Sequence, residues 1–234
     1  GTKMYGVVKT DAYGHGAVPV ARTIDRFVCG YAVATVDEGL KLRRHGIEKE
    51  ILCLGPVSAG RYQECLENDI SLPVFEYRRA KELSDAAVAE GKTAKIHIAV
   101  DTGMSRIGLF PDEGSVETVK EIAELPALRI AGMFTHFARA DEADKTNAGE
   151  QYRRFREFCD DVKAAGVAVP VCHCSNSAGI AEIREANMDM VRAGITLYGL
   201  WPSEEVDQNS LDLKPVMELK THVAYVKDLE AGRA

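Results

Sequence analysis

Lys9 is the first residue of the chain whose type and position suggest chemistry. It directly follows the apolar segment 4–8 and precedes a glycine-rich turn that contains Tyr13. A lysine amine removed from water can act as a nucleophile and form a Schiff base with a carbonyl compound. Glycine residues let the backbone approach a ligand such as a phosphate closely. Taken alone, a lysine in this place is more often a solvated residue at the end of a strand.

Further candidate residues follow later apolar segments of the chain. They are Arg106, His136, Asn176, Ser177, Arg192, Gly194 and Ile195. Taken singly, such arginines are more often surface or ion-paired residues, and Asn176 with Ser177 would more often be an ordinary helix cap. All of them follow segments with the composition of a strand, so the arrangement of those segments decides whether they meet.

Strand-like and helix-like segments alternate along the chain, as judged from apolar periodicity. The strand candidates are 4–8, 31–35, 51–54, 72–75, 94–100, 128–135, 169–174 and 188–191. Helical patterns occur at 18–24, 37–43, 61–67, 77–89, 116–124, 150–165 and 177–183. This alternation predicts an α/β fold, a (β/α)8 TIM-type barrel, with a doubly wound open sheet as the alternative. In a barrel the carboxyl ends of all strands meet at one face, so the candidate residues would share one site.

The end of the chain has a different pattern. Residues 216–226 (VMELKTHVAYV) have the composition of a strand, but no helical pattern follows them. We predict a barrel domain over residues 1–212 and the start of a C-terminal all-β domain over residues 213–234. The chain also begins almost at its first strand, so we expect it to be a fragment at both ends.

Composition limits the classes of function. The formal net charge of −7 argues against non-specific binding of nucleic acid, which needs a basic surface. The sequence contains no apolar run near the length of a membrane span and no signal segment, so we expect a cytoplasmic protein with no membrane partner. We expect the six scattered cysteines to be free thiols. The Cys172-His173-Cys174 trio has no second ligand pair, so we expect no metal site.

Five sequence blocks resemble those of the alanine racemases. Residues 7–16 (VVKTDAYGHG) resemble the pyridoxal-phosphate signature of that family. The blocks DTGMSRIG (101–108), THFARADE (135–142), HCSNSA (173–178) and MVRAGITLYG (190–199) resemble further family blocks in the same order. The resemblance covers essentially the whole chain, and it implies a pyridoxal 5′-phosphate cofactor in the barrel.

The resemblance also implies roles for the candidate residues. Lys9 would hold the cofactor covalently and act as one of two catalytic bases. Arg192 would face the pyridine nitrogen and keep it unprotonated, because a guanidinium cannot give up its proton. Arg106 would approach the substrate carboxylate, and His136 would lie beside the cofactor ring. The phosphate would be bound by Tyr13, Ser177 and the amides of Gly194 and Ile195, with Asn176 also among the cofactor-binding residues.

The same resemblance implies that the chain would interconvert L- and D-alanine in a homodimer and supply D-alanine for peptidoglycan. The second base in the family is a tyrosine of the partner subunit's C-terminal domain, which we expect beyond Ala234. Tyr225 lies before that point and is not assigned. We therefore expect this chain to bind cofactor yet racemise poorly alone. A second departure is Ala99, where many members carry a lysine that fixes the arginine corresponding to Arg106.

Three other functions remain open from the sequence. The first is a serine or broad-specificity racemase of the same fold, because the C-terminal domain helps to set substrate size. A decarboxylase of basic amino acids shares the barrel, but Arg192 in place of a carboxylate disfavours it. A non-catalytic carrier of the same cofactor is the alternative that is not an enzyme, and the segment after residue 213 argues against it.

Overall fold

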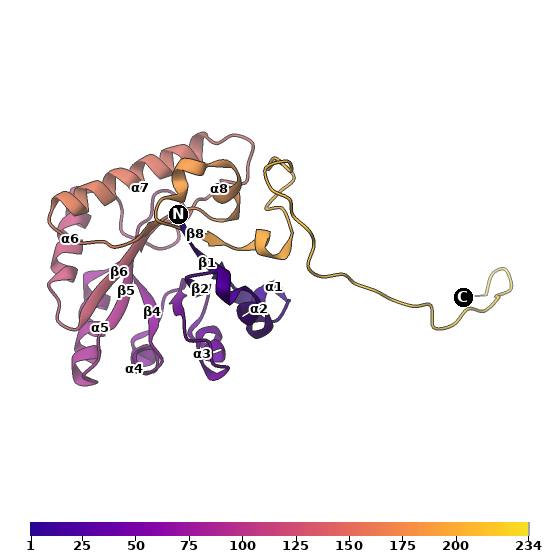
Figure 1. Cartoon of the computed structure of the whole chain (residues 1–234), viewed down its shortest axis with the longest axis horizontal. Coiled ribbons are helices and arrows are strands. Elements are labelled where there is room, and N and C mark those ends of the chain that lie inside the picture. The colour runs from indigo at the N-terminus through magenta and orange to yellow at the C-terminus, as the bar shows by residue number, and fades with distance from the viewer. Residues whose placement is uncertain (234) are drawn as a thin grey trace.

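Eight apolar segments pair as parallel strands in the computed structural model, which describes residues 1–233 (Figure 1). The strands are β1 (Lys3–Val7), β2 (Gly30–Val33), β3 (Glu50–Cys53), β4 (Ile70–Val74), β5 (Ala94–Ala99), β6 (Leu128–Phe134), β7 (Cys172–His173) and β8 (Met190–Ala193). Their order in the sheet is β7-β6-β5-β4-β3-β2-β1-β8. The two end strands approach each other, and the Arg192 amide donates a hydrogen bond of 3.0 Å to the Ser175 carbonyl. The predicted (β/α)8 barrel is thereby confirmed.

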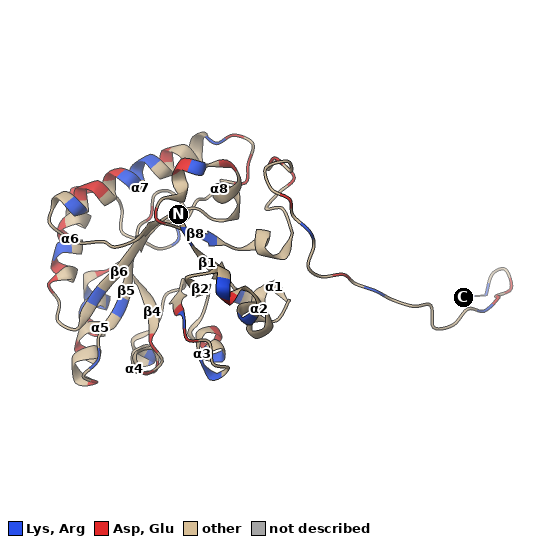
Figure 2. Cartoon of the chain, in the orientation of Figure 1, with Lys and Arg blue, Asp and Glu red and all other residues tan. Residues whose placement is uncertain are grey.

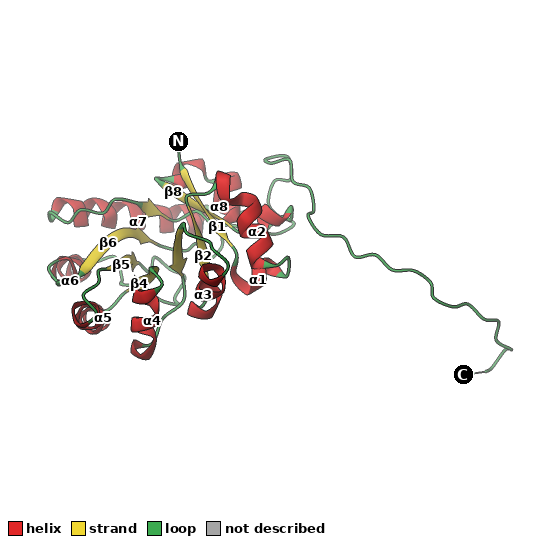
Figure 3. Cartoon of the chain, turned by 60° about the horizontal axis from the view of Figure 1, so that its bottom comes forward, coloured by secondary structure: helices red, strands yellow, loops and turns green. Residues whose placement is uncertain are grey.

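Helices lie outside the strands and cover the barrel (Figure 3). They are α1 (Lys9–Tyr13), α2 (Ala17–Ile24), α3 (Val36–Arg44), α4 (Tyr62–Glu67), α5 (Tyr77–Ala89), α6 (Glu113–Ala123), α7 (Thr146–Ala164) and α8 (Ser177–Glu182), with short 3₁₀ helices η1 (Asp25–Phe27), η2 (Ala59–Arg61), η3 (Arg184–Asn187) and η4 (Ile195–Tyr198). On α5 the buried residues are Ala80, Leu83, Ser84 and Ala87, the spacing of one helical face. The period of 3.6 residues therefore decides which face packs on the strands.

The strands separate two apolar layers. Inside the barrel, Tyr5, Val7, Ala32, Leu52 and Met190 form one cluster of buried residues. Their neighbours in sequence, such as Val8 and Val33, belong to the larger layer between strands and helices. Alternate residues of a strand point to opposite faces, so each strand contributes to both layers. The inner layer forms the floor beneath the carboxyl ends of the strands.

Two predicted segments differ from the structure near the end of the barrel. The seventh strand covers only two residues, β7, instead of 169–174. Pro170 lies in the missing part, and proline has no amide hydrogen to donate to a neighbouring strand. After β8 the chain forms only η4, one turn of 3₁₀ helix, where a full barrel helix would ordinarily stand.

The predicted strand 216–226 is wrong for this structure. Residues 213–233 form neither helix nor strand, and they extend away from the barrel, nearly all of them exposed (Figures 1 and 3). A strand needs a neighbour to accept and donate its backbone hydrogen bonds, and none lies beside this segment among the residues described. The Val216 amide, which donates to the Tyr198 carbonyl at 3.1 Å, attaches the start of the segment to η4. The division into domains at residue 212 stays a prediction.

Charged residues of both signs are mixed over the outer helices (Figure 2). On α7, for example, Arg153 lies 2.8 Å from Glu150 and 2.6 Å from Glu157. Exposed pairs of this kind contribute little to stability, so the surface charges do not explain the fold. Over residues 1–233, none of the helices has the length and apolar composition needed to span a membrane.

Candidate active site

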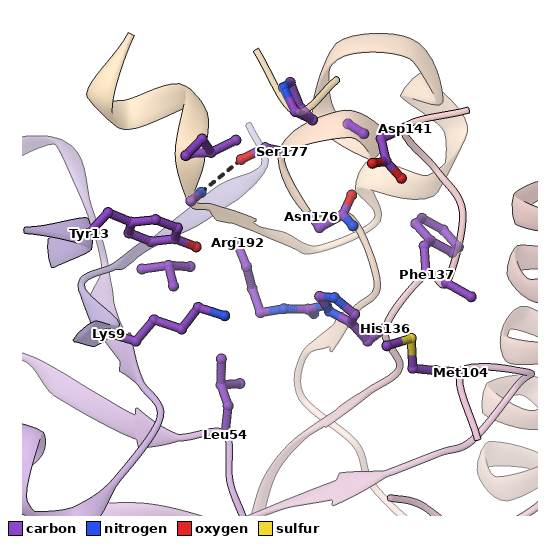
Figure 4. A pocket seen from close by; sticks show the side chains of 16 residues that line it. Lys9, Tyr13, Leu54, Met104, His136, Phe137, Asp141, Asn176, Ser177 and Arg192 are labelled. Carbon is purple, nitrogen blue, oxygen red and sulfur yellow. Dashed lines mark hydrogen bonds between the residues drawn. The ribbon is translucent and has the colours of Figure 1, made fainter. Parts of the chain in front are cut away.

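A pocket of about 370 Å³ opens at the carboxyl ends of the strands (Figure 4). It is lined by Val7, Lys9, Tyr13, Leu54, Met104, His136, Phe137, Ala138, Asp141, Asn176, Ser177, Ala178, Arg192, Gly194, Ile195 and Pro202. Eight of the nine predicted site residues are among them, and the exception is Arg106. Two lining residues carry positive charge and one, Asp141, carries negative charge. The pocket therefore suits an anionic ligand.

Lys9 enters the pocket at the start of a left-handed turn. Thr10, Asp11, Ala12 and Tyr13 all have positive φ, between 52° and 57°. The left-handed conformation costs about 1–2 kcal/mol for each residue with a β-carbon. Such strain persists only where the surroundings fix the backbone. The turn directs both Lys9 and Tyr13 towards the same pocket (Figure 4).

Asp11 holds the left-handed turn in place. Its carboxylate accepts the Ala17 amide at 2.9 Å and the Lys41 ammonium at 2.8 Å. These contacts, the backbone bond first, lower the pKa of Asp11. On the other side of the turn, the Glu38 carboxylate accepts the Thr10 amide at 2.5 Å. Asp11 is not among the residues that line the pocket, so it supports the turn rather than a ligand.

Tyr13 is supported from behind by an aromatic neighbour. The rings of Tyr13 and Tyr198 lie 5.0 Å apart, and the Tyr198 hydroxyl donates to the Val7 carbonyl at 2.7 Å. Burial raises the pKa of Tyr13, so its hydroxyl stays protonated and can donate a hydrogen bond. That hydroxyl lies 3.0 Å from the place where a β-carbon on Gly194 would stand. Glycine at position 194 therefore keeps this edge of the pocket open.

Ser177 lies opposite Tyr13, where the loops after β7 and β8 meet. Its hydroxyl oxygen accepts the Gly194 amide at 3.0 Å (Figure 4). It also accepts the Thr196 amide at 3.4 Å. Asn176 precedes it and caps α8, with its side-chain oxygen accepting the Gly179 amide at 3.0 Å. Amides that converge on one oxygen are the donors that bind an anion such as phosphate. The described residues therefore already contain a polar cradle at this point.

Arg192 is the most deeply buried cation of the pocket, with 3% of its surface exposed. Its guanidinium donates to the carbonyls of Thr135 (2.7 Å), Cys174 (3.0 Å) and His173 (3.1 Å) and to the His173 ring at 2.8 Å. Burial, with a smaller contribution from Arg106, lowers the pKa of Arg192 to about 10. It therefore remains charged at neutral pH, and its carbonyl partners together with the His173 ring orient its side chain.

His136 stands beside Arg192 at the edge of the pocket. Burial, together with the charges of Arg192, Arg106 and Lys9, lowers the pKa of His136 to about 3. The backbone around it is fixed by Gln151 of α7, whose amide donates to the His136 carbonyl at 3.2 Å and accepts from the Ala138 amide at 2.8 Å. His136 is thus a neutral ring in a fixed loop.

The neutral histidines predict a loss of stability in mild acid. Burial and the neighbouring Arg192 also lower the pKa of His173 well below its usual value. The unfolded chain binds protons at both rings as the pH falls below about 6.5, whereas the folded chain does not. The free energy of unfolding should therefore fall by about 1.4 kcal/mol per pH unit for each histidine, from pH 6.5 down towards the folded pKa values.

Urea unfolding between pH 7.5 and 5 measures this slope. The His136→Gln variant should lose about half of it, whereas a variant of the exposed His45 should keep the whole slope. A free energy of unfolding that stays level between pH 6.5 and 5 would contradict the prediction.

Comparison with known proteins identifies the family of this barrel. A family model described as the alanine racemase N-terminal domain matches residues 1–202. The chain belongs to the alanine racemase family. It is 47% identical over 231 residues to an alanine racemase of Clostridium novyi, and the match covers 98% of this chain and 60% of the relative. An alanine racemase of Clostridium tetani is 42% identical over 234 residues and is again covered to 60%. The chain thus spans about 60% of the length of these relatives.

Solved alanine racemases share the barrel. The structure from Clostridium difficile 630 superposes with a TM-score of 0.90 at 40% identity, covering 92% of this chain and 56% of the other. A structure of the Bacillus anthracis alanine racemase with bound L-Ala-P gives a TM-score of 0.85 at 36% identity, covering 92% of this chain and 56% of that one. Both sequence and structure therefore place the pocket in an alanine racemase barrel.

Arg106 lies apart from the other predicted residues of this alanine racemase barrel. It is exposed on a loop that folds back over β5, where the Leu109 amide donates to the Ala99 carbonyl at 2.9 Å. Within residues 1–233 its side chain has no hydrogen bond or ion pair. Ala99 is buried and offers it no polar group. Met104 of the same loop lines the pocket instead, while Arg106 acts on His136 through its charge.

Two buried residues beside the pocket were not predicted. His173 belongs to the sequence block 173–178, but it was considered only within the cysteine–histidine trio. Its ring points into the barrel and meets Arg192. Gln151 lies on α7 and is 2% exposed, which is unusual for its type. A polar residue on the apolar face of a helical pattern was the available signal for Gln151, and a histidine inside an apolar strand was the signal for His173.

Proposed function

We propose that this chain is the cofactor-binding barrel of an alanine racemase, with pyridoxal phosphate held covalently by Lys9. The observation that carries the proposal is that Lys9, the Ser177–Gly194 cradle and Arg192 line one pocket of a barrel of this family. The positive charges of Lys9 and Arg192 and the cradle amides fit a cofactor whose phosphate is anionic. When bound, the cofactor supplies the electron sink for negative charge at the substrate's α-carbon.

At the phosphate end, we assign the cradle to four residues. The hydroxyls of Tyr13 and Ser177 and the amides of Gly194 and Ile195 would bind the phosphate oxygens. Support comes from the pocket lining, which includes all four residues. The Gly194 amide, which donates to the Ser177 oxygen in this structure, would turn to a phosphate oxygen when the cofactor binds. At the other end, Arg192 would face the pyridine nitrogen as a hydrogen-bond donor, with His136 and Asn176 beside the ring. Since Arg192 stays protonated, it leaves that nitrogen without a proton and restrains side reactions such as transamination.

Racemisation removes the α-proton from one face of a carbon and returns a proton to the other. Lys9 would move the proton on its own side, where a positioned base contributes about 10²–10⁴ in rate. Arg106 would approach the substrate carboxylate once substrate is present. The opposite base would come from the partner subunit of a homodimer. We propose a cytoplasmic enzyme that supplies D-alanine for peptidoglycan.

Reconstitution with pyridoxal phosphate tests the binding part of the proposal. The purified chain is titrated with the cofactor, reduced with borohydride and digested, and the modified peptide is located by mass spectrometry. We expect a single reduced pyridoxyl group, on Lys9. Modification spread over surface lysines, with no preferred site, would refute the proposed role of Lys9.

A chimera tests the reaction and its substrate. Residues 1–234 replace the matching part of the Clostridium novyi alanine racemase, which is 47% identical over this region. We expect racemisation of alanine to exceed that of serine, because the Bacillus anthracis relative binds L-Ala-P. A chimera that prefers serine would support a serine or broad-specificity racemase instead.

Ser177→Asp should weaken binding of pyridoxal phosphate about 10²-fold. A carboxylate at this position would take the amides of Gly194 and Thr196 and repel the phosphate. Two unit charges about 6 Å apart interact with about 3 kcal/mol at an effective dielectric constant near 20. The dissociation constant is measured by absorption titration, with Ser177→Ala as the uncharged control. Pyridoxal, which lacks the phosphate, should bind the two variants alike; an equal loss for both ligands would show that the effect is not on the phosphate.

A further inference from the structure

Two buried histidines lie inside the barrel beneath the pocket. His97 of β5 and His173 of β7 are 1% and 0% exposed. Their ring centroids are 5.2 Å apart and the rings are nearly perpendicular. Arg192 lies at one end of the pair and Glu50, the first residue of β3, lies at the other. The proposed function uses neither His97 nor Glu50.

Arg192, His173, His97 and Glu50 thus form a row. The hydrogen bonds along this row can point in only one direction. Arginine has only donors, so His173 Nδ1, 2.8 Å from Arg192 Nη1, must be the acceptor. His173 then carries its proton on Nε2, which lies 3.0 Å from His97 Nδ1. His97 Nδ1 is therefore also an acceptor, and its proton is on Nε2. Each ring is left with one tautomer.

Glu50 fixes the other end of the row. His97 Nε2 is buried, has no hydrogen-bond partner among the described residues, and faces the Glu50 carboxylate at 3.6 Å. The same carboxylate accepts the Ser71 hydroxyl at 2.9 Å. Burial alone would raise the pKa of Glu50, but His97, Tyr5 and Ser71 together lower it to about 2. An ionised carboxylate only accepts hydrogen bonds, so the row runs from a donor, Arg192, to an acceptor, Glu50.

The strands make room for this row. The register of β5 against β6 shifts between Ile96 and His97. Opposite His97 stands Gly132, where a β-carbon would lie 2.7 Å from both Nδ1 and Cε1 of the His97 ring. The ring therefore occupies the space that any other side chain at position 132 would take. A register shift and a glycine at the same point direct His97 towards His173.

We propose that Glu50 and His97 are positioning residues of the cofactor site, which act through His173 to hold the Arg192 guanidinium in one orientation. The proposal rests on the proposed function, in which Arg192 faces the cofactor ring. The Glu50 carboxylate favours a proton on His97 Nε2 because it is negative and has no hydrogen to donate. A glutamine at position 50 could instead donate from its amide nitrogen to His97 Nε2, so that His97 would donate from Nδ1 and His173 would carry its proton on Nδ1. That proton would meet an N–H of Arg192, and the guanidinium would have to move.

The test compares Glu50→Gln with Glu48→Gln, a matched change at an exposed residue two positions earlier. Histidine tautomers are read from ¹⁵N chemical shifts of ¹⁵N-histidine-labelled chain without cofactor. Cofactor affinity is then read from absorption titration with pyridoxal phosphate. In the wild type and Glu48→Gln we expect His97 and His173 as single Nε2–H tautomers.

In Glu50→Gln we expect mixed tautomers at both rings and a cofactor affinity about 10-fold lower. Residues that orient a metal ligand through a hydrogen bond have effects of this size on metal affinity. Glu50→Asp, which keeps the carboxylate, should restore both readouts. Unchanged tautomers in Glu50→Gln, or changed tautomers with unchanged affinity, would overturn the proposal. Failure of the wild type to bind cofactor would instead refute the proposed function, because the tautomers are measured without cofactor.

Discussion

Lys9→Ala is expected to abolish covalent attachment of pyridoxal phosphate and to slow racemisation by the chimera about 10²–10⁴-fold. Its amine is the one that the left-handed turn directs into the pocket, where its Nζ lies 5.8 Å from the centre of the Tyr13 ring. Alanine provides neither the bond to the cofactor nor the base for the α-proton. Borohydride reduction followed by mass spectrometry measures the first effect, and the rate of D-alanine formation measures the second.

Two further variants separate the amine of Lys9 from its charge and from the turn. Lys9→Arg keeps a positive charge but should also fail to bind the cofactor covalently. Lys41→Ala removes a lysine that holds the same turn through Asp11 but lies outside the pocket. Lys41→Ala should therefore retain attachment at Lys9. Covalent attachment in Lys9→Ala at the wild-type level would show that another amine binds the cofactor.

Arg192→Leu is expected to destabilise the barrel by about 3–5 kcal/mol, apart from any effect on the cofactor. The Arg192 guanidinium donates to the carbonyls of Thr135, His173 and Cys174 and to the His173 ring. Leucine leaves these buried acceptors without a donor, and each unsatisfied group costs about 1–3 kcal/mol. A loss of this size is a large part of the total stability of a domain.

Urea unfolding of the cofactor-free chain measures this loss. Arg153→Leu is the matched control, because Arg153 forms only exposed ion pairs with Glu150 and Glu157. Its loss should be within about 1 kcal/mol. If the two variants were equally stable, Arg192 would not hold the loops together, and its role would be limited to the ligand.

The barrel could be predicted from the sequence because its helices and strands repeat with different periods. The 77–89 helix was predicted with the bounds it has in the structure, since apolar residues recur along one face. Parallel strands then place their carboxyl ends together, which brought eight predicted residues to one pocket. Their roles came from family resemblance, because a single lysine or arginine has no distinctive spacing.

Features that depend on tertiary contacts could not be predicted. The left-handed turn at Thr10–Tyr13 holds four consecutive residues with β-carbons in a conformation that such residues adopt rarely and singly, and it depends on contacts with Glu38 and Lys41 from α3. The segment 216–226 has the pattern of a strand, but pattern alone supplies no neighbour. Likewise, the row from Arg192 to Glu50 joins residues 50, 97, 173 and 192, whose separation in sequence hides their contact.

The seam between β7 and β8 has a consequence for how the molecule opens. Besides the Arg192 amide bond to Ser175, the Asp189 carboxylate accepts the Cys172 amide at 2.8 Å across it. Few backbone hydrogen bonds cross this seam, and the Arg192 side chain supplies others through the His173 and Cys174 carbonyls. Amide hydrogens at the seam should therefore exchange with solvent early, and earlier still when Arg192 is replaced. Ser177 follows one side of this seam and Gly194 the other. A ligand bound between them would join the two sides of the seam. Part of its binding free energy would therefore stabilise the barrel against opening.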